Sequence, residues 1–269
     1  MRLKDFERQF ETLLLDEPAE HILRVLVNRP HAANSLSTKM GEEIIDVFLA
    51  LAVSPAVYRC VILTAAGDRV FCAGADLKER DGMSDEAFQR QHYLFERMMR
   101  QIWECPVPVI AALNGHTMAG GLELALNCDF AYAVETAKFG FPEVKRGIMP
   151  GGAGTQHLPR RIGEARAKEL ILTGEPFSAA QALEWGVINR ICAAGRLMEE
   201  VLETAGRICA NAPLSTVQAK KSITHGLQMD VRTGMFFEIE AYYRLIPTRD
   251  RQEGINAFVE KRDPVFTGR

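Results

Sequence analysis

The sequence predicts an α/β fold in which mostly parallel strands alternate with helices over residues 1–195, followed by a helical region over residues 196–269. Two observations support this prediction. Short runs rich in β-branched and aromatic residues alternate with segments in which apolar residues recur every three or four positions. After about residue 190 the strand signals stop and only helical patterns remain. Such alternation is typical of a sheet built largely from parallel strands.

Four short apolar runs are predicted to form buried strands, because Pro, Gly, Asn or Asp bounds them. They span residues 22–28, 58–64, 108–113 and 129–133. Helices are predicted around residues 36–51 and 88–102, where apolar side chains share one helical face. Two capping boxes, in which side chain and backbone satisfy each other's free donors, predict further helix starts. They are Ser178 with Gln181 and Ser215 with Gln218.

The composition is that of an ordinary globular enzyme. Of the 269 residues, 47% are hydrophobic and 25% are charged, which excludes collagen-like, disulfide-knot and disordered chains. The net charge is −3, without the strong positive field of most nucleic-acid-binding proteins. No apolar run approaches the roughly 18 residues that cross a bilayer. We therefore expect neither nucleic acid nor a membrane as a partner.

The cysteines and histidines predict neither disulfides nor a metal site. The six cysteines are scattered without a C-x-x-C pair, and the six histidines show no H-x-x-x-H spacing. A reducing compartment fits such a chain. Residues 1–10 contain acidic side chains and no apolar core of a secretory signal. We expect a cytoplasmic protein with no bound metal.

The first candidate site is FCAGADLKE at residues 71–79, where small residues separate an apolar strand from a charged helical stretch. Small residues let a ligand approach the backbone and leave amide N–H groups free to donate. A tight turn that needs glycine is the alternative interpretation. This motif alone therefore does not define a site.

The second candidate site is NGHTMAGGLELAL at residues 114–126, where a glycine pair precedes an apolar helix start. Free N–H groups and the helix dipole there favour an oxygen that becomes negative during a reaction. Glu123 lies between Leu122 and Leu124, so its carboxylate is expected to lose hydration and to need a partner or a raised pKa. A structural Glu that caps the helix start or pairs with a distant Arg is the alternative.

The third candidate site is FGFPEV at residues 139–144, which places Glu143 in an apolar stretch before the glycine-rich residues 147–155. That glycine-rich segment lacks the Lys and Ser or Thr of a phosphate-binding loop, and no G-x-G-x-x-G follows a strand. The G-x-S-x-G elbow of serine hydrolases is also absent from the sequence. Sites for ATP or NAD are therefore disfavoured.

Together these segments resemble the crotonase (enoyl-CoA hydratase/isomerase) superfamily, from NRP at 28–30 and NSL at 34–36 to FVEKR at 258–262. FCAGADLKER, GGLELAL and PGGAGTQHLPRRIGEARAKELI are most similar to the methylglutaconyl-CoA hydratase branch. The resemblance implies a spiral of strand-strand-helix units, with C-terminal helices that build trimers. It also implies a hexamer formed as a dimer of trimers, and a role in fatty acid metabolism.

The resemblance also implies roles for single residues. The amides of Ala75 and Gly120 would form an oxyanion hole for the thioester oxygen, and Glu123 and Glu143 would be the catalytic carboxylates. Residues implied to bind the CoA part of the substrate are Ala73, Asp76, Leu77 and Lys78, with Phe258 and Lys261 reaching the CoA of a neighbouring subunit. Two positions depart from the usual family pattern: Ala119 replaces a glycine, and His157 replaces an arginine.

The reaction that the resemblance implies is hydration of a 2-enoyl-CoA to a 3-hydroxyacyl-CoA, without a cofactor because CoA is part of the substrate. Methylglutaconyl-CoA hydratase, or another crotonase-fold lyase such as a carnitinyl-CoA dehydratase, is the alternative within this class. A non-catalytic CoA-ester-binding or RNA-binding protein is the alternative from another class. The presence of both Glu123 and Glu143 argues against the first of these, and the acidic pair Glu42 and Glu43 argues against RNA.

The acyl pocket is harder to assign from the sequence. Met83, Met98 and Trp103 are candidates for its lining, but core packing is the favoured use of each.

Overall fold

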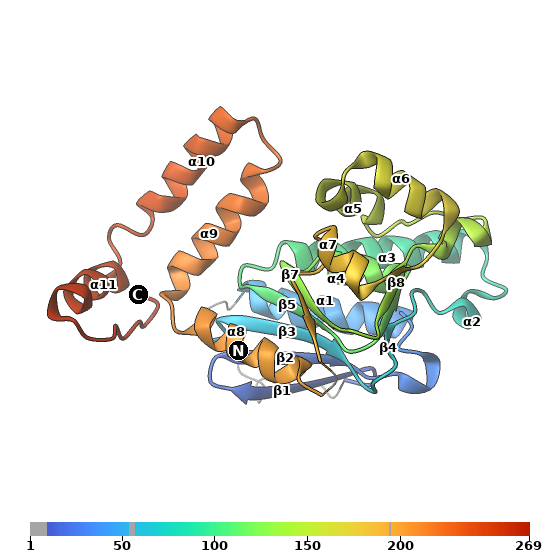
Figure 1. The fold of residues 1–269 in the computed structure, drawn as a ribbon, viewed down its shortest axis with the longest axis horizontal. Coiled ribbons are helices and arrows are strands. Elements are labelled where there is room, and N and C mark those ends of the chain that lie inside the picture. Colours follow the sequence, from blue (N-terminus) through green and yellow to red (C-terminus); the bar gives the residue numbers. More distant parts are fainter. Residues whose placement is uncertain (1–9, 54–56, 194) are drawn as a thin grey trace.

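A six-stranded sheet forms the centre of the computed structural model, which describes residues 10–53, 57–193 and 195–269 (Figure 1). Its strands, in spatial order, are β1 (Leu13–Ala19), β2 (Ile22–Val27), β3 (Cys60–Ala65), β5 (Val109–Leu113), β7 (Phe130–Val134) and β10 (Arg190–Cys192). Only β1 and β2 pair antiparallel, and every other pair in this sheet is parallel. The four predicted strands are β2, β3, β5 and β7. The expectation of no secretory signal rests on residues 1–10, of which residues 1–9 lie outside the described residues.

A smaller sheet packs beside the first and was not predicted from the sequence. It contains β4 (Val70–Cys72), β6 (His116–Met118), β8 (Lys138–Gly140) and β9 (Phe177–Ser178). Each of β3, β5 and β7 in the large sheet is followed along the chain by β4, β6 or β8 in the small sheet, and then by a helix. This repeated unit confirms the predicted spiral of strand-strand-helix units.

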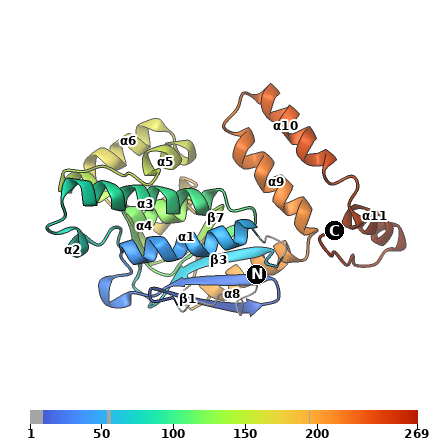
Figure 2. The same cartoon turned by 180° about the vertical axis from the view of Figure 1, so that it is seen from behind.

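The helices of the core cover both faces of the large sheet (Figures 1 and 2). On one face, α1 (Thr38–Val53) and α3 (Asp85–Trp103) pack in the main hydrophobic core together with Val61 and Leu63 of β3. On the other face, α8 (Leu197–Cys209) packs against Cys60 and Ile62. Successive side chains of a strand point to opposite faces, so burial on both sides explains the continuous apolar sequence of β3.

Short helices connect the strands and surround the small sheet. They are η2 (Pro30–Ala32), α2 (Leu77–Arg80), α4 (Gly120–Leu126), η3 (Pro142–Arg146), α5 (Gly154–Ile162), α6 (Glu164–Thr173) and α7 (Ala179–Glu184). Ser178 caps α7 in a complete capping box with Gln181, as predicted. In the part of the chain that the structure describes, no helix has both the length and the apolar character needed to cross a membrane.

The C-terminal region is helical, as predicted. Its last three helices, α9 (Pro213–Gly226), α10 (Val231–Tyr243) and α11 (Arg249–Glu260), form an arm that projects from the sheets (Figure 1). The predicted helix start at Ser215 is wrong: α9 begins at Pro213, because proline has a helical φ and needs no partner for a missing N–H. The first helix of this region, α8, packs on the large sheet and is not separate from the core. The domain boundary near residue 195 therefore stays a prediction.

The predicted acidic face of α1 is also partly wrong. Glu43 is fully buried, and its carboxylate accepts hydrogen bonds from the amides of Glu11 and Thr12 and from the Thr12 hydroxyl. It therefore ties α1 to the start of β1 instead of repelling an anion in solvent. Only Glu42 of this pair is exposed, so only one of the two charges counts against RNA binding at this helix.

Candidate active site

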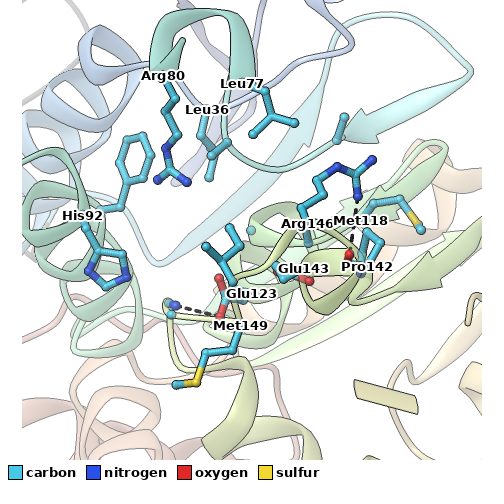
Figure 3. Close-up of a pocket in the computed structure, with 18 of the residues that line it drawn as sticks. Leu36, Leu77, Arg80, His92, Met118, Glu123, Pro142, Glu143, Arg146 and Met149 are labelled. Atoms are coloured by element: carbon cyan, nitrogen blue, oxygen red, sulfur yellow. Dashed lines mark hydrogen bonds between the residues drawn. The ribbon is translucent and has the colours of Figure 1, made fainter. Parts of the chain in front are cut away.

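A cavity of about 800 Å³ opens between α2, α3, α4 and η3, and it contains the main residues of all three candidate motifs (Figure 3). Ala75, Gly120, Glu123 and Glu143 all line it. Figure 3 shows both carboxyl groups beside one another near the centre of this cavity. Three segments that are separate in the sequence therefore meet at one site.

The start of α4 lies against the loop after β4, because glycine allows the backbones to approach closely. A Cβ atom on Gly121 would lie 2.3 Å from the carbonyl oxygen of Cys72, so no larger residue fits there without a shift. A Cβ atom on Gly120 would lie 3.8 Å from the amide nitrogen of Ala75, so the backbones of these two residues lie close together. Among the described residues, neither the Ala75 nor the Gly120 N–H has a hydrogen-bond acceptor. Two free donors therefore border the cavity.

Ala119, the residue before these donors, has strained backbone angles. Its φ of 52° and ψ of −130° are far more favourable for glycine than for alanine. Strain of this kind costs on the order of 1–3 kcal/mol and is found where a site needs an unusual backbone course. Here the Ala119 amide donates to the carbonyl of Gly140, which holds the turn in place.

Glu123 is held by the glycine-rich segment at the start of α5. Its Oε1 accepts hydrogen bonds from the amides of Gly152 (2.6 Å) and Gly154 (2.9 Å). A Cβ atom on either glycine would come within 3 Å of the carboxylate oxygens. Burial raises the pKa of Glu123, although these two amide bonds favour the charged form. The glycine-rich segment that lacks the features of a phosphate-binding loop therefore holds a carboxylate.

Glu143 follows Pro142 in the first turn of η3 and is 8% exposed. In the described structure its Oε2 is buried without a hydrogen-bond partner. Burial and, secondarily, the charge of Glu123 raise the pKa of Glu143 to about 7, against the opposing effect of Arg146. The two acids therefore differ: one is held by amides, and the other is poised to keep a proton near neutral pH.

Comparison with known proteins agrees with this geometry. Residues 17–269 match the enoyl-CoA hydratase/isomerase family. The chain belongs to this family. YngF of Bacillus subtilis is 43% identical over 258 residues, which are 96% of this chain and 99% of YngF. A crotonyl-CoA hydratase of Syntrophomonas wolfei is 38% identical over 257 residues, with 96% of this chain and 98% of the relative covered.

Solved structures of this enoyl-CoA hydratase/isomerase family have the same fold. The crystal structure of an enoyl-CoA hydratase from Bacillus anthracis has a TM-score of 0.94 at 42% identity, over 96% of this chain and 100% of that one. The predicted superfamily and fold are confirmed, and the comparisons support the predicted enoyl-CoA hydratase activity.

The family resemblance also implied substrate-binding residues, and the structure places them in different surroundings. Ala73 and Leu77 line the cavity, whereas Lys78 is an exposed residue of α2. Asp76 is not among the lining residues: it caps α2 by accepting from the amides of Lys78 and Glu79, and pairs with Arg29 at 2.8 Å. These contacts fix the loop that presents Ala75, and a contact of Asp76 with CoA stays a prediction.

Phe258 and Lys261 are not brought to this cavity within one chain. Phe258 lies in α11 and Lys261 ends it, and both are exposed. Figures 1 and 2 show α11 and α2 at opposite ends of the molecule. Their contact with the CoA of a neighbouring subunit stays a prediction.

The lining of this cavity includes side chains that were not assigned to it from the sequence. Met98 is in the core, and neither Met83 nor Trp103 lines this cavity. One wall instead consists of the α3 side chains Phe88, His92, Phe95 and Met99. Their spacing of three and four residues places them on one helical face. A search for a polar residue within an apolar helical stripe would have found His92.

Proposed function

We propose that this protein is an enoyl-CoA hydratase that adds water to the double bond of a 2-enoyl-CoA and gives a 3-hydroxyacyl-CoA. One observation supports this most: Glu123 and Glu143, with pKa values raised by burial, share a cavity with the free amides of Ala75 and Gly120. The names of the relatives, among them a crotonyl-CoA hydratase and a short-chain-enoyl-CoA hydratase, agree with this reaction.

The two amides would stabilise the negative charge that develops on the thioester oxygen. When water attacks the β-carbon, the electrons of the double bond move toward the carbonyl and form an enolate. A fixed N–H donor aimed at such an oxygen contributes about 3 kcal/mol to the transition state, judged from single-donor deletions in other enzymes. Because the N–H groups of Ala75 and Gly120 have no acceptor in the described structure, both donors are available.

The two acids would transfer the protons of the reaction. Glu123 has Oε1 occupied by two amides, so its Oε2 accepts a hydrogen from the water and takes that proton as the oxygen bonds to the β-carbon. Protonated Glu143 gives its proton to the α-carbon. The proton on Glu123 then passes to Glu143, which restores the starting pair.

Hydration of crotonyl-CoA tests this function directly. Addition of water removes the conjugated double bond, so ultraviolet absorbance falls with time. We expect turnover within the ordinary enzymatic range of about 1 to 1000 per second. Constant absorbance with crotonyl-CoA and with longer or branched 2-enoyl-CoA esters would exclude a hydratase.

A second substrate, methylglutaconyl-CoA, is favoured by Arg80. The guanidinium of Arg80 lines the cavity, donates from Nε to Gln91 at 2.8 Å and lies 4.4 Å from the centre of the Phe88 ring. Among the described residues its terminal nitrogens have neither a hydrogen-bond acceptor nor an ion-pair partner. A carboxylate at the end of the acyl chain would supply that partner. Figure 3 shows Arg80 and His92 on the same side of the cavity.

Replacement of Arg80 by methionine is expected to change the choice of substrate. Loss of a charge-assisted hydrogen bond should lower kcat/KM for methylglutaconyl-CoA, relative to crotonyl-CoA, by about tenfold or more. Arg90→Met is the matched control, because Arg90 is exposed and pairs with Glu86 away from the cavity. An unchanged ratio in Arg80→Met would show that Arg80 does not bind that carboxylate.

We also propose a homohexamer in a reducing cytoplasm, without a cofactor beyond the CoA of the substrate. The arm supports assembly, since large apolar side chains such as Leu227, Val231 and Phe258 are each more than 75% exposed on it. All six cysteines are buried and free, which fits a reducing compartment.

A further inference from the structure

Asn127 does not line the cavity, but its side chain joins two parts of the site behind Glu123. Asn127 ends α4 one turn after Glu123 and is 4% exposed. Its Nδ2 donates to the backbone carbonyl of Glu123 (2.8 Å) and to that of Gly152 (3.1 Å). One amide group therefore links the helix that bears Glu123 to the segment that holds its carboxylate.

His157 of α5 completes this arrangement. Its Nε2 lies 3.2 Å from Oδ1 of Asn127. Since both hydrogens of the Asn127 amide group are already donated, Oδ1 is the acceptor and Nε2 carries the proton. Burial and the nearby charges of Arg161 and Arg160 lower the pKa of His157 to about 4, so the ring is neutral at physiological pH. The Trp103 ring packs against it at 6.2 Å between centres.

Gly152 connects this pair to the reacting group. The Gly152 carbonyl accepts a hydrogen bond from Nδ2 of Asn127, and the Gly152 amide donates to Oε1 of Glu123. A rotation of the backbone at Gly152 would therefore weaken both contacts together. The opposite oxygen of Glu123, Oε2, is the one that faces the water in the proposed reaction.

We propose that Asn127 and His157 are positioning residues, which hold Gly152 so that its amide keeps the Glu123 carboxylate aimed at the reacting water. This inference rests on the proposed hydratase function. Its physical basis is geometric, because a displacement of about 1 Å in a catalytic group can lower a rate by as much as 100-fold. If the buried pair served stability alone, its removal would lower the melting temperature without altering catalysis by Glu123.

The readout that separates these two roles is the acid limb of the pH profile. Amide bonds to a carboxylate lower its pKa, so a weakened Gly152 bond should raise the pKa of Glu123. The charged or titratable groups that line the cavity with Glu123 are Glu143 and Arg146 from η3, Arg80 from α2 and His92 from α3. None of these four contacts the Asn127–His157 pair, so they stay the same in the variants. On α5, which packs against the helix of Glu123, the charged groups are Arg160 and Arg161, and both are kept in every variant of the pair.

His157→Phe and His157→Gln form the test with crotonyl-CoA as substrate. Phenylalanine keeps the ring packing and loses the donor, so we expect kcat to fall about tenfold, KM to change less than about twofold, and the acid limb to move to higher pH. Glutamine can still donate to Oδ1 of Asn127, so most of the activity should return. Asn127→Ala tests the pair from its other member and should resemble His157→Phe.

Gln156→Ala is the matched control on α5, because Gln156 is exposed and contacts neither Asn127 nor Glu123. Thermal unfolding identifies any variant that does not fold. Wild-type kcat in both His157→Phe and Asn127→Ala, or a lower kcat with an unmoved acid limb, overturns the inference. If the wild-type protein itself does not hydrate crotonyl-CoA, the proposed function fails instead, so the two failures are distinct.

Discussion

Glu123→Gln and Glu143→Gln should each lower the turnover of crotonyl-CoA hydration by at least about two orders of magnitude, in line with the contribution of general acid-base catalysis. Glutamine matches the shape of glutamate and still accepts hydrogen bonds, so in Glu123→Gln the new side chain can keep the amides of Gly152 and Gly154 as partners. What each variant loses is the ability to take or give a proton. Binding of the CoA ester should persist in both.

Steady-state kinetics and binding of a product or substrate ester measure the two parts of this expectation. Glu169→Gln is the matched control, because Glu169 is an exposed residue of α6 away from the cavity. Turnover near that of the wild type in either variant would remove that carboxylate from the mechanism. A loss of binding equal to the loss of turnover would instead indicate a role in holding the substrate.

The large sheet could be predicted because burial leaves a continuous record in the sequence. Strands such as β3 are covered on both faces, so nearly every residue is apolar. The small sheet leaves no such record, since β4, β6 and β8 are three residues long and too short to show a period. The edge strand β1 contains Asp16, Glu17 and Pro18 and is half exposed, which conceals it for a different reason.

The candidate site could be predicted in its parts but not in its connections. Glu123 is conspicuous as a carboxylate among leucines, but its partner Gly152 lies 29 residues away and only the fold joins them. Glu43 shows the opposite error, since its charge was interpreted as part of a solvated helical face. Only its partners, residues 11 and 12, show that it is buried. Pairing between distant residues is therefore what the sequence conceals.

The pH dependence should show a steep fall in kcat/KM above neutrality. Glu143 gives a proton to the α-carbon, so only its protonated form is active. Its pKa is raised to about 7. It is therefore half protonated at pH 7 and about 1% protonated at pH 9, and kcat/KM, which reports the free enzyme, should fall about fiftyfold over that range.

Two variants test the assignment of this basic limb to Glu143. In Glu143→Gln the residual activity should show no such fall, because a glutamine side chain does not titrate. In Glu123→Gln the neighbouring negative charge is lost, and since that charge helps to raise the pKa of Glu143, the basic limb should move to lower pH. A limb that stays in place in Glu123→Gln would mean that the two carboxyls do not interact, and a flat wild-type profile from pH 7 to 9 would mean that Glu143 is not the acid.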